Sequence, residues 1–362
     1  MGSTETTKPI GGIDTLPRLP GKPLPGFYFQ WHFLECCNLR CKHCYQQEYQ
    51  AKSLPVSDLL RIAQNIESAL ARWKHVGRVS LTGGEPLMQP DVLFRLLDYL
   101  EASSHFNWVG ILTNGTLITP EIAEGLARYS KLREVQVSLD GSTSAVHDST
   151  RGNGSFNKAI RGITLLRESG INTAVMFTLT KRNVDDALNM IDYAIDLGVN
   201  ALTIERATPT GLQFEITDSI APGLLMEVYT KIDIRKKALG KESQLKLRTS
   251  RPLWCLVDSN SGGFCPVGYS CLSILHDGTV LPCRRLEIPL GNVLTDGIFR
   301  IWYTSPILWK LRNKQLLHNS CRTCSLLANC GGCRAAAYAT SGDYMGADPQ
   351  CWISQLQQTP KP

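Results

Sequence analysis

Three cysteines near the start of the chain constrain its fold and chemistry more than any other feature. Cys37, Cys41 and Cys44 have the spacing C-x3-C-x2-C, and Tyr45 follows directly. Thiolates are the soft ligands that iron–sulfur clusters prefer. Three of them on one short loop can hold three irons of a cubane cluster and leave the fourth iron open for chemistry. The spacing therefore predicts a catalytic iron–sulfur cluster at this loop.

Zinc is the alternative metal for such a loop. A structural zinc site needs four protein ligands, and only His43 or Cys36 lies close enough in the sequence to be the fourth. The chain has 13 cysteines, four of them at residues 36–44 and nine between Cys255 and Cys351. In a chain without an export signal, so many cysteines favour metal or cluster ligation over disulfides. Two separate metal-bearing regions are expected.

The composition of the chain excludes several classes of protein. No run of about 18 apolar residues occurs, so neither a membrane span nor a membrane partner is expected. Residues 1–25 are polar, are rich in Pro and Gly, and lack an apolar signal region, so a flexible arm on a cytoplasmic protein is expected. The net charge of +6 is not gathered into basic runs with interleaved aromatic residues, so nucleic acid is not an expected partner.

Strand and helix patterns alternate six times through the first two thirds of the chain. The expected strands cover 27–35, 76–82, 108–113, 134–140, 172–180 and 201–205. The expected helices cover 57–73, 91–102, 120–129, 156–169, 184–197 and 224–238. Such alternation is typical of parallel strands with right-handed crossovers, and six units suit a partial (β/α)6 TIM-like barrel. A doubly wound sheet is the alternative, but no G-x-G-x-x-G turn follows the first strand.

Unusual residues gather where the expected strands end. The cluster loop follows the first strand, and Gly83-Gly84-Glu85-Pro86 follows the second. The third strand ends at Asn114, and the fourth runs through Ser138 to Asp140. Because the functional sites of (β/α) barrels lie at the carboxyl ends of the strands, these loops are expected to meet at one site.

The sequence CNLRCKHCY at residues 37–45 resembles the signature loop of the radical S-adenosylmethionine (SAM) enzymes. The resemblance implies that the amino and carboxylate groups of SAM chelate the open iron of a [4Fe–4S] cluster. It also implies a reaction in which reductive cleavage of SAM gives methionine and a 5′-deoxyadenosyl radical. The three loop cysteines are then the catalytic cluster ligands.

The same resemblance implies roles for the loops at the strand ends. Gly83, Gly84 and Glu85 would contact the methionine amino group, with a plain strand-to-helix turn as the alternative. Ser138 and Asp140 would bind the ribose hydroxyls, unless they form a helix cap or an Asx turn. The remaining expected SAM contacts are Tyr45 near the adenine, Asn114, Arg151, and Arg206, which faces either the SAM carboxylate or the substrate.

The C-terminal third changes character at Cys255. Asp277-Gly278 between apolar residues predicts a hairpin, and eight cysteines suit two fully ligated [4Fe–4S] clusters. A module of zinc-ribbon type is the alternative, because paired C-x2-C motifs also suit zinc. The Gly278-x4-Cys283 step and the run from Cys321 through Cys324 to Cys330 resemble the SPASM extension of radical SAM enzymes. This small α+β domain is expected at residues 250–356, after a barrel at 26–245.

The SPASM resemblance implies two ligand sets. The first auxiliary cluster would take Cys265, Cys271, Cys283 and Cys333. The second would take Cys321, Cys324, Cys330 and Cys351. Only two residues separate Cys330 from Cys333, where the family usually has three, which leaves the geometry at Cys333 open. Cys36 and Cys255 are left over and are expected to be buried or spare thiols.

The resemblance implies the substrate only in outline. SPASM enzymes often form thioether or carbon–carbon links in ribosomally made peptides, so peptide modification is expected, with a small-molecule oxidoreductase as the alternative. A zinc- and nucleic-acid-binding module is less favoured. A flavodoxin or ferredoxin is the expected reductant, and a separate leader-binding protein is a candidate partner because no leader-binding domain precedes the barrel.

One position separates the chain from the sulfatase-maturing branch of the family. Those relatives carry an Asp, which serves as the base, directly after the cysteine of the Gly-x4-Cys step; here Arg284 and Arg285 follow Cys283. A guanidinium remains protonated near neutral pH and cannot act as a base, but it can grip a carboxylate. Arg284 or Arg285 is therefore expected either to bind an acidic group of the substrate or to hold Glu287. Tyr338, Asp343 and Glu205 are the candidate bases.

Overall fold

The computed structural model describes residues 26–46, 49, 53–210, 218–240, 242–261 and 263–353. The expected N-terminal arm at 1–25 lies outside these residues. Seven parallel strands run in chain order through the sheet. They are β1 (Phe27–His32), β2 (Gly77–Thr82), β3 (Phe106–Thr113), β4 (Leu132–Ser138), β5 (Thr173–Leu179), β6 (Ala201–Arg206) and β7 (Lys246–Arg248). The predicted α/β architecture with a parallel sheet is confirmed.

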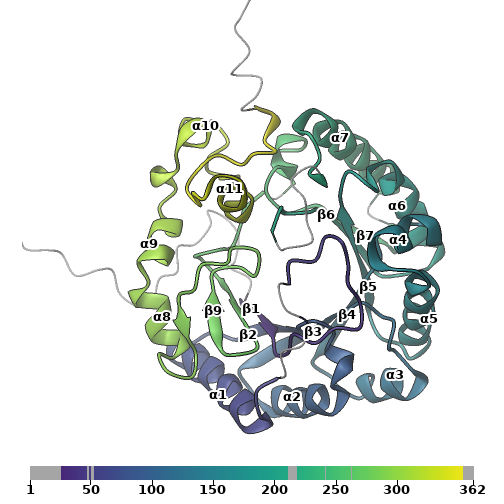
Figure 1. Ribbon diagram of the computed structural model, residues 1–362, viewed down its shortest axis with the longest axis vertical. Helices are drawn as coiled ribbons and strands as arrows, with labels where there is room; N and C mark the ends of the chain where they lie inside the picture. The colour runs from purple at the N-terminus through teal and green to yellow at the C-terminus, as the bar shows by residue number, and fades with distance from the viewer. Residues whose placement is uncertain are drawn as a thin grey trace, which may run out of the picture.

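Helices follow the strands and cover the outer side of the curved sheet (Figure 1). In the barrel they are α1 (Val56–Trp73), α2 (Pro90–Ala102), α3 (Pro120–Leu126), α4 (Ser144–Arg151), α5 (Ser155–Glu168), α6 (Ala187–Asp196) and α7 (Pro222–Leu239). Further on they are α8 (Ile298–Thr304), α9 (Pro306–Arg312), α10 (Asn319–Arg322) and α11 (Arg334–Ser341). In Figure 1, α8, α9 and α10 lie between α1 and α7, so that they complete the ring of helices. The sequence pattern missed α4, which is only eight residues long.

The core forms because strand and helix periodicities place apolar side chains on facing surfaces. In β1, Phe27, Phe29 and Trp31 alternate along the strand and are almost completely buried. The Phe27 ring stacks on Trp73 of α1, with centroids 4.7 Å apart, and meets Trp302 of α8 edge-on at 4.9 Å. One aromatic side chain thus packs a barrel helix and a C-terminal helix against the same strand.

The C-terminal region shares the barrel sheet, which the sequence did not reveal. The sheet order is β10-β9-β8-β1-β2-β3-β4-β5-β6-β7, with β8 (Cys271–Ile274), β9 (Thr279–Leu281) and β10 (Gly291–Asn292) added at β1. β8 pairs with β1 in parallel, and β9 pairs with β8 antiparallel. The predicted hairpin is therefore present, and Gly278 at its turn has the positive φ of +86° that favours glycine.

None of the helices in the described residues is long and apolar enough to cross a membrane. The domain boundaries at 245 and 250 stay a prediction, because the sheet continues across them through the pairing of β8 with β1.

Candidate active site

The loop with Cys37, Cys41 and Cys44 follows β1 directly. Each of its three sulfurs lies close to a nitrogen donor from a neighbouring group. The backbone N–H of Leu39 donates to Cys37 Sγ at 3.4 Å, and that of Gln46 donates to Cys44 Sγ at 3.4 Å. Hydrogen bonds to sulfur stabilise negative charge, so this environment suits thiolates that ligate iron.

Two thiols of this loop, those of Cys37 and Cys41, do not ionise readily without a metal. Burial raises the pKa of the Cys37 thiol to about 12, and burial also raises the pKa of Cys41. A cluster supplies the positive charge that favours the thiolate form, so ligand deprotonation and cluster assembly are coupled. The three cysteines therefore fit the catalytic [4Fe–4S] cluster that the sequence predicts.

Asp140 anchors the cluster loop to the barrel. His43 Nε2 lies 2.6 Å from Asp140 Oδ2, and the backbone N–H of Thr178 in β5 donates to Oδ1 at 2.8 Å. Asp140 is completely buried. Burial alone raises its pKa, but the charge of Arg151, together with His43, outweighs burial and holds the pKa well below its usual range. A permanently charged carboxylate thus connects the loop with β4 and β5.

Arg151 lies between this carboxylate and the cluster loop. Its Nε donates to Asp140 Oδ2 at 2.5 Å, and its Nη1 lies 3.8 Å from Cys41 Sγ. Lys42 N–H also donates to the Thr150 carbonyl at 3.0 Å, which fixes the loop against the end of α4. Both Asp140 and Arg151 are therefore bound to protein groups, and their predicted contacts with SAM stay predictions. Ser138, the last residue of β4, is half-buried.

The histidine behind Asp140 is held neutral. His147 Nδ1 accepts a hydrogen bond from the Asp140 backbone N–H at 3.0 Å, which places its proton on the other ring nitrogen. Burial and the charge of Arg151 lower the pKa of His147 to about 4. This arrangement ties α4 to the end of β4.

The glycines after β2 allow close contact with the cluster loop. Gly84 N–H donates to the Leu34 carbonyl at 3.0 Å, and Glu85 N–H donates to the Cys36 carbonyl at 2.9 Å. A Cβ on Gly84 would lie 2.1 Å from the Cys36 oxygen, so only glycine fits there. The predicted contact of these glycines with the methionine amino group is not tested by these distances.

Glu85 connects the ends of β2 and β3. Its Oε1 accepts from Thr113 Oγ1 at 2.6 Å and from Leu87 N–H at 3.2 Å, while Oε2 accepts from Asn114 N–H at 2.6 Å. The Asn114 side chain in turn donates to Asn38 Oδ1 at 2.9 Å and lies 4.0 Å from Cys37 Sγ. Five of the predicted SAM-site residues therefore lie against the cluster loop, as expected from the ends of neighbouring parallel strands: Gly84, Glu85, Asn114, Asp140 and Arg151.

Arg284 packs on the aromatic residue that follows the last loop cysteine. Its guanidinium stacks over the Tyr45 ring at 4.6 Å, and its Nη1 donates to Glu287 Oε1 at 2.6 Å. Arg284 is buried, so its charge is neutralised by Glu287 and packed on the aromatic residue that follows Cys44. Of the two roles expected for Arg284, the structure shows the contact with Glu287.

Arg206, at the end of β6, reaches the C-terminal region. Its Nη1 and Nη2 donate to the two oxygens of Asp348, at 3.1 and 2.5 Å, and Nη1 also donates to Gln350 Oε1. The sequence predicts that Arg206 faces the SAM carboxylate or the substrate. In the structure its guanidinium forms a buried bridge between the barrel and the C-terminal region, and its contact with SAM or substrate stays a prediction.

A cluster of arginines surrounds Glu205 inside the barrel. Glu205 is buried, and Arg251 Nε lies 3.4 Å from its Oε1. Burial raises the pKa of Glu205, although the charges of Arg251 and Arg285 act in the opposite direction. Arg285 donates to Thr208 Oγ1 at 3.2 Å. Asp343, another candidate base, is half-buried and pairs with His318.

The cysteines assigned to the first auxiliary cluster lie near one another. Cys265 interacts electrostatically with Cys283 and Cys333, and Cys271 interacts with Cys265 and Cys283. Cys271 begins β8, and Cys283 follows β9. The Cys333 backbone N–H donates to Asp348 Oδ2 at 2.7 Å, so the residue with unusual spacing is held in place by the partner of Arg206.

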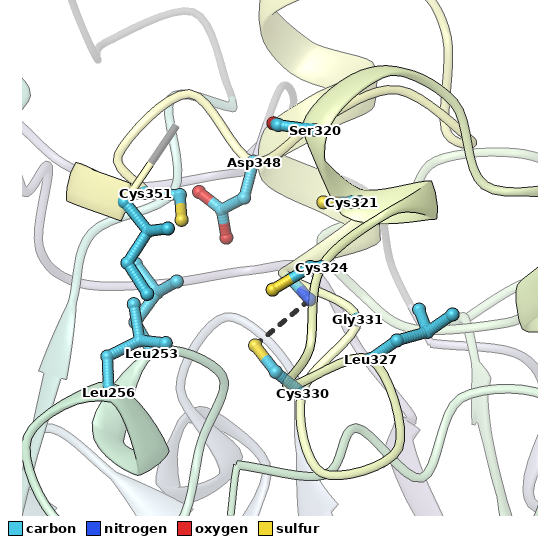
Figure 2. A pocket seen from close by; sticks show the side chains of 12 residues that line it. Leu253, Leu256, Ser320, Cys321, Cys324, Leu327, Cys330, Gly331, Asp348 and Cys351 are labelled. Carbon is cyan, nitrogen blue, oxygen red and sulfur yellow. Dashed lines mark hydrogen bonds between the residues drawn. The ribbon is translucent and has the colours of Figure 1, made fainter. Parts of the chain in front are cut away.

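The cysteines assigned to the second auxiliary cluster line one cavity. Figure 2 shows Cys321, Cys324, Cys330 and Cys351 around this space. Asp348 and Leu253 also line it, and the space not filled by atoms is about 400 Å³. The backbone N–H of Gly332 donates to Cys330 Sγ at 3.3 Å. Four thiols and a backbone donor around one cavity fit a fully ligated [4Fe–4S] cluster.

Zinc fits these sites less well. Among the described residues, no three His, Cys, Asp or Glu side chains converge closely enough to hold a single metal ion. Tetrahedral zinc with Zn–S bonds of about 2.3 Å brings its sulfurs within about 4 Å of one another. Thiols that gather at two sites without converging on one ion suit clusters of several irons.

The sequence analysis missed two residues that organise the site. It considered His43 only as a zinc ligand, whereas the structure pairs it with Asp140. It did not consider Asp348, which contacts Arg206, Cys333 and the second cysteine cavity. The proximity of His43 to the loop cysteines was a signal for the first, but no local pattern marks Asp348.

Comparison with known proteins is consistent with this site. The family model of the radical SAM superfamily matches residues 31–194, and that of an iron–sulfur cluster-binding domain, SPASM, matches residues 265–325. The first range contains Cys37, Cys41 and Cys44, and the second contains Cys265, Cys271, Cys283, Cys321 and Cys324.

Two characterised relatives match almost the whole chain. The AdoMet-dependent heme synthase of Methanosarcina barkeri is 29% identical over 340 residues, which are 89% of this chain and 95% of the relative. The mycofactocin maturase MftC of Mycobacterium ulcerans is 31% identical over 361 residues, covering 92% and 91% of the two chains.

Among solved structures, Streptococcus suis SuiB bound to S-adenosylmethionine has the same fold. Its TM-score is 0.71 at 19% identity, and the match covers 90% of this chain and 77% of SuiB. SuiB has also been solved with its precursor peptide SuiA.

Proposed function

The chain belongs to the radical SAM superfamily and carries a SPASM domain, and from this premise we propose that it modifies a ribosomally made peptide. The two domains imply SAM and [4Fe–4S] clusters, including auxiliary clusters, as cofactors. When bound at Cys37, Cys41 and Cys44, the first cluster supplies the electron that cleaves SAM to methionine and a 5′-deoxyadenosyl radical. The similarity to MftC supports the peptide as substrate.

Arg285 is the residue that we propose for binding an acidic group of the peptide. Arg206 pairs with Asp348, Arg284 with Glu287 and Arg251 with Glu205. Among the described residues, Arg285 forms no ion pair and donates only to the neutral hydroxyl of Thr208. It is half-buried, so a substrate carboxylate can reach it and be bound through two hydrogen bonds. A guanidinium beside Glu205 that forms no ion pair with any described residue is the observation that favours an anionic substrate group.

Glu205 is the residue that we propose for holding the proton released from the substrate. Its pKa is raised by burial, and a buried carboxylate whose pKa is closer to neutral can accept a proton at working pH. The Nε of Arg251 lies 3.4 Å from Glu205 Oε1 and orients this carboxylate. The pair places a base next to the proposed carboxylate-binding residue.

A mass-spectrometric assay tests this function. Anaerobically purified enzyme is incubated with SAM, dithionite and short peptides encoded beside the gene, uniformly deuterated. We expect deuterium in 5′-deoxyadenosine and a peptide of lower mass. Arg285→Lys should raise the KM for the peptide about tenfold or more while changing kcat less, because lysine cannot form the two-pronged contact. The exposed Arg235→Lys variant is the control. The assay is repeated with two kinds of proposed partner: a flavodoxin or ferredoxin as the reductant, and a separate leader-binding protein.

A heme precursor is the second candidate substrate. The heme synthase of Methanosarcina barkeri matches over 95% of its length, and a tetrapyrrole with carboxylate side chains would also suit Arg285. Conversion of a carboxylate-bearing iron porphyrin, with no turnover of any peptide, would favour this alternative over peptide modification.

A further inference from the structure

Cys255 is the cysteine that neither ligand set uses, and it lies directly behind the second auxiliary cluster site. Its thiol is within hydrogen-bonding reach of the Cys330 sulfur. Gly263 packs against it so closely that an added Cβ would lie 2.5 Å from Cys255 Sγ and 3.1 Å from the Asn329 carbonyl oxygen. Two independent contacts therefore place Cys255 beside the segment that carries Cys330.

Cys255 does not face the cavity of the second cluster. Cys255 lies in the short 3-10 helix η4 (Trp254–Leu256), whose N-cap is Leu253. Leu253 and Leu256 line the cavity, and Cys255 is not among the lining residues. Only 3% of Cys255 is exposed. Its thiol thus lies within reach of a ligand sulfur and outside the lining of the cavity, which suits a hydrogen-bond donor better than a fifth ligand.

The same segment aims a backbone donor at Cys330. Leu253 has φ +81°, a left-handed conformation that is unfavourable for a β-carbon-bearing residue, and its side chain is completely buried. In this conformation its backbone N–H lies near the Cys330 sulfur. On the other side of the sequence, Gly332 N–H donates to the Cys330 sulfur at 3.3 Å, so groups of two segments lie around this ligand.

The donor segment is fixed to the barrel. Trp254, next to Cys255, stacks on Tyr229 of α7 with ring centroids 3.7 Å apart and planes 1° from parallel. Tyr229 also meets Trp352 edge-on at 6.1 Å, beside the cluster cysteine Cys351. Because the segment is held by large buried aromatic rings, the donors remain aligned when the cluster changes charge.

We propose that Cys255 is a positioning residue whose thiol donates a hydrogen bond to Cys330 and raises the reduction potential of the second auxiliary cluster. Reduction adds one negative charge to the cluster, and part of that charge resides on the ligand sulfurs. An S–H or N–H dipole directed at a sulfur stabilises the reduced form more than the oxidised form. The second auxiliary cluster thereby becomes the better electron acceptor. The inference rests on the SPASM cluster and is independent of the substrate.

Redox titration followed by electron paramagnetic resonance tests the proposal. All variants are made in anaerobically purified protein in which Cys37, Cys41 and Cys44 are changed to Ala, so that only the auxiliary clusters remain. Adding Cys324→Ala to this protein identifies the signal that belongs to the second auxiliary cluster. We expect Cys255→Ala to make its midpoint potential more negative, and Cys255→Ser to restore part of the shift because a hydroxyl still donates. Cys36→Ala, a matched loss of an unassigned thiol, should leave both potentials unchanged.

A second variant separates donation from folding. Gly263→Ala should displace the Cys255 thiol without removing it and should shift the potential in the same direction as Cys255→Ala. An unchanged potential in Cys255→Ala with full iron content would overturn the proposal. Loss of four irons in Cys255→Ala, with retention of them in Cys330→Ala, would also overturn it, because Cys255 would then be a ligand.

Discussion

Arg206 and Asp348 form a buried, two-pronged ion pair across 142 residues of sequence, with Nη1–Oδ1 and Nη2–Oδ2 distances of 3.1 and 2.5 Å. Asp348 also accepts from the backbone N–H of Cys333 at 2.7 Å and lines the cavity of the second auxiliary cluster. The pair therefore joins the end of the last full barrel strand to ligand segments of both auxiliary clusters. Through this ion pair, the barrel helps to hold the auxiliary clusters in place.

Removing one member of this pair should cost more stability than removing both. Asp348→Asn leaves the Arg206 charge buried without its partner, which is expected to destabilise the protein by about 3 to 5 kcal/mol. The double variant Arg206→Met/Asp348→Asn should be no less stable than Asp348→Asn alone. Denaturant unfolding of the anaerobic holoprotein measures both. As control, Arg235→Ala breaks an exposed pair with Asp192 and should cost less than about 1 kcal/mol. Strictly additive losses would contradict the coupling.

The catalytic cluster depends on three cysteines acting together. Changing Cys37, Cys41 and Cys44 to Ala should remove about one third of the iron, four of about twelve atoms in three [4Fe–4S] clusters. Formation of 5′-deoxyadenosine from SAM should stop, because no other group is expected to bind SAM to an open iron. Iron analysis and chromatography give both results, and Cys36→Ala serves as control. If the triple variant still produced 5′-deoxyadenosine, the assignment of the catalytic cluster would be wrong.

Asp140 should be required for loading of the catalytic cluster. Asp140→Asn removes the charge that pairs with Arg151 and His43 and leaves Arg151 buried without a counter-charge. We expect reduced iron at the first site, slower SAM cleavage and a loss of about 3 to 5 kcal/mol of stability. The exposed Asp192→Asn is the matched control. Full iron content together with normal SAM cleavage in Asp140→Asn would show that the loop does not need this anchor.

His147 should make the protein less stable in mild acid. Its pKa of about 4 in the folded protein is below the usual value of 6.5 for histidine, so the unfolded chain binds a proton first as the pH falls. Stability is therefore unaffected above pH 6.5 and declines between 6.5 and about 4, by about 2 to 3 kcal/mol in total. Burial also lowers the pKa of His32, so His32 decreases stability in acid as well. The test is therefore the difference in stability between the wild type and His147→Asn.

Thermal melting of the anaerobic holoprotein from pH 7.5 to 5 measures this difference. The asparagine side chain can still accept from Asp140 N–H but does not titrate. The melting temperature of His147→Asn should therefore fall less with acid than that of the wild type. Parallel curves for the two proteins would contradict the assigned pKa.

The enzyme should not make formylglycine. The position that follows the cysteine of the Gly-x4-Cys step is Arg284, and its guanidinium is bound to Glu287 and stacked on Tyr45, so it cannot accept a proton. Anaerobic incubation with SAM, dithionite and a sulfatase-type peptide bearing Cys or Ser should give 5′-deoxyadenosine without an aldehyde in the peptide. Stoichiometric formylglycine, detected by mass spectrometry, would overturn this prediction.

The sequence by itself determined the local parts of the molecule. Strand and helix periodicities depend on neighbours two to four positions apart, so the six predicted strands and their helices could be read from residues such as Phe27, Phe29 and Trp31. The cysteine spacing at Cys37 and the Asp277-Gly278 turn are local as well, because a loop of a few residues brings its own ligands together. The expected meeting of strand ends followed from the handedness of parallel crossovers.

Only the tertiary structure decided which distant groups pair. Nothing near Arg206 in the sequence indicates Asp348, and an Arg at a strand end suits a SAM carboxylate as well as a buried aspartate. The pairing of β8 with β1, the contact of His43 with Asp140 and the position of Cys255 behind Cys330 are likewise long-range. Such contacts depend on the packing of the whole chain. A buried charge without a partner is costly, but this cost arises only when the fold buries the charged group, so it cannot be read from the neighbouring sequence.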